Sequence, residues 1–120
     1  MSRKQLLIAN KVSDAQSLAS DFQTDPITIE TADNIGLWIE VPAGITDNTG
    51  VFTVQVRPYK DANNFGPWAD LTTTYTLADA AATFFRKEVQ LPTCQIRVSF
   101  VAAGTTPDGT CDIWFSATGS

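Results

Sequence analysis

The sequence predicts an all-β fold, an antiparallel β-sandwich or jelly-roll-like domain with an extended N-terminal arm. From Ile27 onward, apolar and polar residues alternate with a period of two, as in strands with one buried face. Runs rich in Gly, Pro, Asn and Asp separate these segments. The 120 residues suffice for one domain with its own core. We therefore predict an arm over residues 1–25 and a sandwich domain over residues 26–120.

Four segments alternate most regularly, and each has one apolar face. They are Ile35–Val41, Val51–Pro58, Cys94–Ala102 and Thr110–Ser116. Successive side chains of a strand point to opposite faces, so the apolar face of each segment is predicted to be core. The predicted core residues are Ile35, Leu37, Ile39, Val41, Phe52, Val54, Val56, Cys94, Ile96, Val98, Phe100, Cys111, Ile113 and Phe115.

Three further segments are predicted as strands from a weaker alternation. They are Ile27–Glu30, Trp68–Thr72 and Thr83–Leu91. Phe84 and Phe85 are adjacent in the last of these, so their side chains must point to opposite faces. We expect one ring in the core and the other in contact with something else.

The first 25 residues have a different pattern, because Ser13–Gln23 is rich in Ser, Ala, Asp and Gln and has no clear apolar face. We expect an arm that lies along the body or reaches a neighbour. The first eleven residues contain three basic residues and no acid, which fits either an acidic partner surface or a solvated tail. The residues of the arm that we place at a possible interface are Arg3, Lys4, Leu6, Leu7 and Lys11.

Composition argues against several classes of partner. The chain has 13 acidic and 8 basic residues, a formal net charge of −5 at pH 7. An acidic body repels phosphate, so we expect no nucleic-acid partner. No apolar stretch approaches the roughly 20 residues of a membrane-spanning helix, and the first apolar run is too short for a signal peptide. We expect no membrane association and a reducing compartment.

The residue types needed for common catalytic chemistry are missing. The sequence has no histidine, the commonest general base and metal ligand. Two cysteines without histidine do not make an ordinary zinc site, and no phosphate-binding glycine motif occurs. We therefore expect no enzyme, no cofactor and no metal. A hydrolase that uses two of the acidic residues is a formal alternative.

Cys94 and Cys111 lie on the apolar faces of their strands, which predicts buried thiols. A disulfide would require Cα atoms within about 7 Å. If the hairpin turns near residue 106, Cys94 lies at its far end from Cys111, so a disulfide is the less favoured alternative.

Trp38 and Trp114 lie opposite the apolar faces of their strands. Such residues pack in a second layer, anchor a protein interface or stack on a sugar. All three roles are open, and we include both residues in the possible interface. Trp68 follows Gly66-Pro67 at the start of a predicted strand, and we expect it to close one end of the core.

Four motifs follow one another between residues 35 and 116. They are Gly-x-Phe-x-Val-x-Val in Gly50–Tyr59, Trp-x-x-Leu in Gly66–Leu71, Leu-Pro-x-x-x-Ile-Arg in Leu91–Phe100, and the final strand in Gly109–Ser116. In order and spacing they resemble the small β-sandwich proteins encoded beside the major capsid gene of tailed bacteriophages and prophages, the capsid decoration or cement proteins. Pro58-Tyr59 departs from this pattern, because many relatives have a Ser-Asn turn there.

The resemblance implies a virion structural protein that decorates and stabilises a capsid by bridging neighbouring capsid subunits. It implies the major capsid protein as partner, a homo-oligomer (dimer or trimer), assembly in the host bacterial cytoplasm and a final place on the capsid surface. Related sandwiches serve as head fibres, tail components and carbohydrate-binding modules. The alternative is therefore a carbohydrate- or receptor-binding domain, with Trp38, Trp114 or Tyr59 as stacking platforms.

Overall fold

The structure, a computed structural model, describes the backbone of residues 5–29, 32–42, 45–61, 64–91 and 94–119. Side chains are described for residues 14–29, 35–42, 45–61, 64–71, 74–85 and 94–116. The regular elements in these ranges are all strands, which confirms the predicted all-β class. They are β1 (Gln5–Ser17), β2 (Phe22–Gln23), β3 (Ile27–Ile29), β4 (Ala32–Val41), β5 (Val51–Asp61), β6 (Asn64–Phe65), β7 (Ala69–Thr76), β8 (Ala82–Leu91), β9 (Cys94–Val101) and β10 (Thr110–Gly119).

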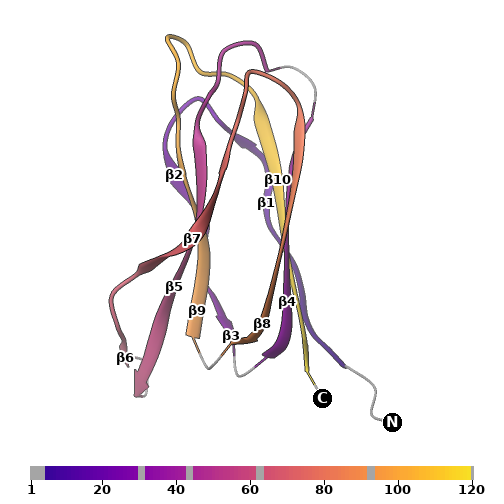
Figure 1. The fold of residues 1–120 in the computed structure, drawn as a ribbon, viewed down its shortest axis with the longest axis vertical. Helices are drawn as coiled ribbons and strands as arrows, with labels where there is room; N and C mark the ends of the chain where they lie inside the picture. The colour runs from indigo at the N-terminus through magenta and orange to yellow at the C-terminus, as the bar shows by residue number, and fades with distance from the viewer. Residues whose placement is uncertain (1–4, 30–31, 43–44, 62–63, 92–93, 120) are drawn as a thin grey trace.

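The strands form two antiparallel sheets that face each other (Figure 1). Sheet A has the order β1-β10-β4-β8. Sheet B has the order β2-β9-β5-β6, with β3 also beside β9 and β7 also beside β5. In Figure 1 sheet A lies on the right and sheet B on the left. Because neighbouring strands such as β4 and β5 belong to different sheets, the chain passes repeatedly from one sheet to the other.

The facing sides of the two sheets enclose one hydrophobic core. The predicted core residues of β4, β9 and β10 are buried, as are Phe52 and Val54 of β5, while Val56 is partly buried against them. The rings of Phe52 and Phe100 lie 4.6 Å apart between centroids and so join β5 to β9. Full burial of one such side chain stabilises a fold by roughly 1.5–3 kcal/mol. Period-two alternation therefore predicted the core well.

The N-terminal segment is part of sheet A, so the predicted arm over residues 1–25 is not confirmed. β1 pairs with β10, and β2 pairs with β9 in sheet B. The register of β1 shifts between Leu6 and Ile8, between Lys11 and Ser13, and between Ser13 and Gln16. Each shift exchanges the inward and outward positions, which removes the regular alternation from the sequence.

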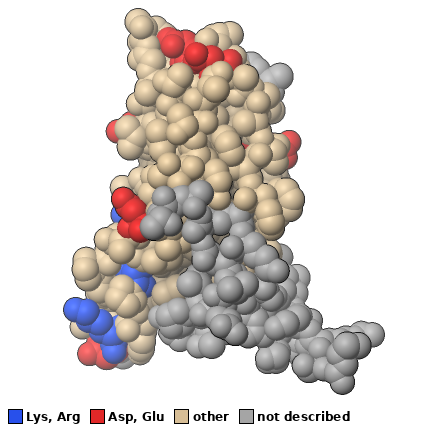
Figure 2. Space-filling view, in the orientation of Figure 1, with Lys and Arg blue, Asp and Glu red and all other residues tan. Residues whose placement is uncertain are grey.

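A buried asparagine joins the loops at one end of the molecule. The Asn48 side chain is fully buried, and its Nδ2 donates to the carbonyl oxygens of Leu18 (2.9 Å) and Asp108 (3.0 Å). Its Oδ1 accepts from the Gly50 N–H at 2.9 Å. Acidic side chains gather on the surface of this end, at the top of Figure 2. The loops that carry Asp47, Asp79 and Asp108 are thus held in place by internal hydrogen bonds.

Candidate functional site

An exposed aromatic pair lies on the outer face of sheet A. Leu37 and Ile39 of β4 point into the core, so Trp38 between them points outward. Phe85 of β8 is its register partner, and the two ring centroids are 4.4 Å apart with planes inclined by 37°. Trp38 is 46% exposed and Phe85 is 49% exposed. This pair leaves an apolar surface in water on the side of the sheet opposite the core.

Trp114 extends this pair into a row across the sheet. It lies opposite Trp38 in the register of β10 with β4, and its side chain is partly buried. Lys11 of β1 lies opposite Trp114 in register. We call Trp114, Trp38 and Phe85 the aromatic row. One register line, from Lys11 to Phe85, therefore crosses every strand of sheet A.

The backbone and polar neighbours shape the surroundings of the row. A Cβ atom added at Gly36 would lie 3.0 Å from the Ser116 hydroxyl oxygen and 3.7 Å from the Phe85 ring. The Phe85 ring thus lies over a strand position that has no side chain. On the other side of the row, Glu40 lies opposite Asp112 on the same outer face. The result is an apolar patch with carboxylates at one margin.

The structure brings together three of the seven interface residues expected from the sequence. Trp38 and Trp114 are cross-strand neighbours, and Lys11 lies in the next register position. Leu6 and Leu7 belong to β1, outside the described side chains. The remaining two residues of the expected interface, Arg3 and Lys4, lie outside the described residues.

Two aromatic residues were misjudged or missed in the sequence. Phe85 was not identified as part of a site, although the adjacent Phe84 and Phe85 indicated that one ring would leave the core. Trp68 was expected to close the core, and this prediction is wrong. Its ring is partly buried and contacts the guanidinium groups of Arg57 and Arg97 on the outer face of sheet B.

The two cysteines are free and buried, as predicted. Burial raises the pKa of the Cys94 thiol. Burial, together with the nearby charge of Asp112, raises the pKa of Cys111 to about 12. Since the thiolate is the reactive form, neither residue is suited to act as a nucleophile at neutral pH.

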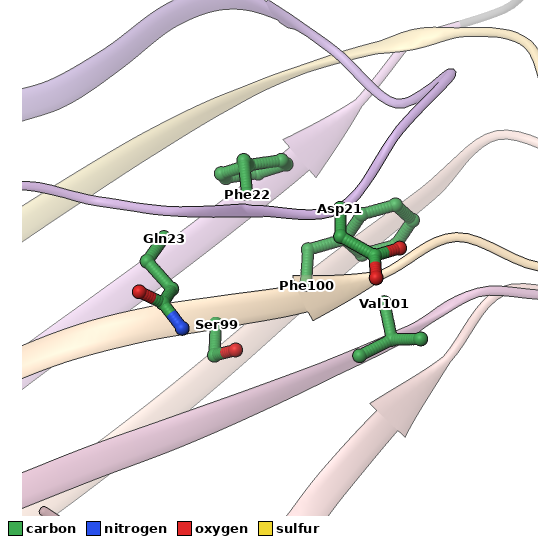
Figure 3. Close-up of a pocket in the computed structure, with 6 residues that line it drawn as sticks. All are labelled: Asp21, Phe22, Gln23, Ser99, Phe100 and Val101. Carbon is green, nitrogen blue, oxygen red and sulfur yellow. The ribbon is translucent and has the colours of Figure 1, made fainter.

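A shallow pocket of about 260 Å³ lies where β2 meets β9 (Figure 3). The Asp21 carboxylate at its rim accepts a hydrogen bond from the Ala102 N–H at 2.8 Å. The side chains of Gln23 and Ser99 lie next to each other in register. The volume is below the roughly 300 Å³ at which ligand pockets begin. The lining residues are Asp21, Phe22, Gln23, Ser99, Phe100 and Val101.

Among the described residues, no three Cys, Asp or Glu side chains form a group that could hold a metal ion. The described part of the chain also has no helix that could cross a membrane. The aromatic row is the best-defined candidate site, because Trp38 and Phe85 are in ring contact and each stays about half exposed.

Comparison with known proteins gave no match. No protein-family model matches the chain, and no curated protein or solved structure does. The function is accordingly inferred from the aromatic row and from the order of the sequence motifs.

Proposed function

We propose that this chain is a virion structural protein that decorates a bacteriophage capsid and stabilises it by bridging neighbouring capsid subunits. The observation that carries the proposal is the aromatic row on the outer face of sheet A. Trp38 and Phe85 leave nearly half of their surface in water, 46% and 49%. Aromatic residues are enriched at protein interfaces, and Trp is among the residue types enriched in hot spots there. A partner that covers the row would remove this apolar surface from water.

We also propose that the fold is a jelly-roll type of β-sandwich. The strand orders support this reading once β2 and β3 are taken as one interrupted strand beside β9, and β6 and β7 as another beside β5. Two four-stranded sheets result, and most successive strands alternate between them. Jelly rolls of this kind occur in viral capsid and lectin domains. The topology is compatible with the proposed role without defining it.

The partner that we propose is the major capsid protein, contacted on the capsid surface after assembly in the bacterial cytoplasm. A capsid presents many copies of one binding site, and a homo-oligomer of this chain, a dimer or a trimer, would engage several of them at once. Multivalent engagement raises the overall affinity without new contacts. A moderate affinity of each aromatic row would then be enough for stable decoration.

Co-sedimentation with heads that lack this protein tests the proposal. The heads would come from the phage or prophage that encodes the chain. We expect the wild-type protein to pellet with the heads and Trp38→Ala to bind about thirtyfold more weakly or worse, because truncation of an interface hot spot costs about 2 kcal/mol or more. Val101→Ala is the control, since Val101 is 56% exposed but belongs to β9 of sheet B, away from the aromatic row. If wild-type protein stays in the supernatant, the proposal is wrong.

A carbohydrate- or receptor-binding role is the second candidate. It is favoured by Glu40 and Asp112, whose positions beside Trp38 would supply hydrogen-bond acceptors next to a stacking ring. A glycan array and the change of tryptophan fluorescence on sugar addition test it. Hits that disappear in Trp38→Ala would support this role, whereas an array without hits and an unchanged emission spectrum would exclude it.

A further inference from the structure

Two arginines lie on the outer face of sheet B, on its central strands. Arg57 of β5 lies opposite Gln95, and Arg97 of β9 lies opposite Gln55. Each arginine therefore faces a glutamine, and the two arginines are diagonal neighbours. Diagonal positions in an antiparallel pair are about 7–8 Å apart, within reach of long side chains.

The glutamines hold both guanidinium groups without neutralising them. The Nε of Arg57 donates to Gln95 Oε1 at 2.8 Å, and the Nη2 of Arg57 donates to the same oxygen. The Nε of Arg97 donates to Gln55 Oε1 at 2.8 Å. An amide oxygen is a neutral acceptor, so these bonds orient the arginines and leave their charge uncompensated.

The Trp68 ring also contacts the guanidinium groups of Arg57 and Arg97. The Cζ atom of Arg97 lies 4.1 Å from the centroid of the Trp68 ring, and that of Arg57 lies 4.7 Å away. The Phe65 ring lies 5.0 Å from Arg57 Cζ. Cation–π contacts at these distances are attractive and restrict the side chains. The two arginines are therefore preorganised on the surface of the sheet.

Within the described part of the chain, neither arginine forms an ion pair. The carboxylate of Asp70 is hydrogen-bonded to Gln55, whose Nε2 donates to Asp70 Oδ1 at 2.7 Å. Partial burial and the charge of Arg57 lower the pKa of Arg97 from its usual value. Two like charges are thus held close together, an arrangement that a bound anion would stabilise.

The charges elsewhere on the molecule also bear on the surroundings of Arg57 and Arg97. The formal net charge of the chain is −5, and many of the acidic side chains drawn gather at the loop end. In Figure 2 the Lys and Arg side chains that are drawn lie toward the opposite end, near β5 and β6, and some acidic side chains lie beside them. An anionic partner would therefore be repelled less at this end of sheet B than at the loop end.

We propose that Arg57, Trp68 and Arg97 form an oxyanion site that binds the carboxylates of an acidic protein segment. A guanidinium group pairs with a carboxylate through two parallel hydrogen bonds, and Arg57 and Arg97 retain Nη donors for this purpose. The choice of a protein segment rests on the proposed function, in which the partner is a protein. Because the site lies on sheet B and the aromatic row on sheet A, it would provide the second contact that bridging requires.

A titration followed by NMR tests the site on the full-length protein. The probe is a blocked hexaglutamate peptide, and the signals are the Nε–H groups of the arginines and the indole N–H of Trp68. We expect saturable shifts of these signals with the wild-type protein. Arg57→Gln and Arg97→Gln should each weaken binding by about tenfold or more, as expected for loss of hydrogen bonds to a charged group. Lys60→Gln is the matched control, because it removes the same charge from an exposed residue of β5.

Two results would overturn the site. The first is the absence of saturable shifts at the arginines of the wild-type protein. The second is peptide binding by Lys60→Gln that is as weak as binding by Arg97→Gln, because this would mean that only net charge matters. Inorganic phosphate that binds as tightly as the peptide at equal ionic strength would overturn the assignment to a protein segment. Since the wild-type shifts report on Arg57 and Arg97 directly, the test does not depend on the stability of the variants.

The result is separable from that for the proposed function. If heads bind the protein but the peptide does not, the oxyanion site is wrong and the decoration proposal stands. If the peptide binds at the arginines but heads do not, the decoration proposal is wrong and the site stands.

Discussion

Asn48 is the residue on which the loop end of the molecule depends. Besides the three hydrogen bonds of its side chain, its backbone N–H donates to Asp79 Oδ1 at 2.6 Å, and its carbonyl oxygen accepts from the Asp79 N–H at 3.1 Å. One buried side chain thus satisfies backbone groups from three separate loops. Because Asn48 is fully buried, the loss of these bonds would leave buried polar groups without partners, which is costly.

We predict that Asn48→Ala lowers the free energy of unfolding by about 2–4 kcal/mol, because two carbonyl groups and one N–H lose their partners. Urea unfolding of wild type and variant measures the change. Asn64→Ala is the matched control, since Asn64 is exposed and should shift stability by less than about 0.5 kcal/mol. Equal effects of the two substitutions would contradict the role assigned to Asn48.

Asp108 lies at the same end of the molecule and makes the free energy of unfolding depend on pH. The Thr46 hydroxyl donates to its Oδ2 at 2.7 Å, and the N–H groups of Asp47 and Thr46 also donate to the carboxylate. The Thr46 hydroxyl and then these backbone N–H groups lower the pKa of Asp108 from its usual 3.8. A lowered pKa means that the carboxylate stabilises the folded state above pH 3.8, and that this contribution is lost as the pH falls through the lower folded value.

We therefore predict that Asp108→Asn is less stable than wild type at pH 7, and that the two proteins converge as the pH falls below about 3.8. Urea midpoints of both proteins across this range measure the effect. A difference that stays constant from pH 7 to the acid limb would mean that the charge of Asp108 is not involved.

Strands with a regular alternation of apolar and polar residues were predictable, and β1, whose register with β10 shifts three times, was not. The alternation in β4, β9 and β10 directly indicated which side chains are buried. The sequence did not predict β1, because its register with β10 shifts three times and bulges interrupt a period of two. A local sequence pattern also does not show which strands pair with each other. Trp38 could be placed on an outer face, but its contact with Phe85 depends on the pairing of β4 with β8.

The same limit applies to sheet B. The Arg97–Trp68 contact joins the loop before β7 to β9. No local signal connects these positions, and the start of the predicted strand at Trp68 suggested a core residue instead. Residue faces were thus predictable from the sequence, while neighbours across strands required the fold.

The place of β1 in sheet A has a direct experimental consequence. We predict that deletion of residues 2–17 causes aggregation or loss of cooperative unfolding, because β10 would become an exposed edge beside the buried Ile113 and Phe115. Size-exclusion chromatography and thermal unfolding measure this outcome. Deletion of residues 2–4, which precede β1, is the control and should leave the unfolding transition nearly unchanged. If the longer deletion unfolds like wild type, β1 behaves as an arm and not as part of the sheet.

At the scale of the whole molecule, the two outer faces differ in chemistry. Sheet A carries the aromatic row, and sheet B carries the arginine pair stacked on Trp68. A body with an aromatic row on one face and an arginine pair on the other can touch two different surfaces of an assembly at once. The two contacts should respond differently to salt, because salt screens exposed charges and leaves apolar burial intact.

We predict that binding of the wild-type protein to heads weakens several-fold between about 50 and 500 mM NaCl, over which the Debye length falls from roughly 14 to 4 Å. Arg97→Gln should bind more weakly at low salt and show a flatter salt dependence. Trp38→Ala should bind more weakly at every salt concentration and keep the wild-type slope. Since the two residues lie on opposite sheets, the free-energy changes of the double variant should add within about 0.5 kcal/mol. One common salt slope for all three proteins would mean that the arginine face takes no part in the contact.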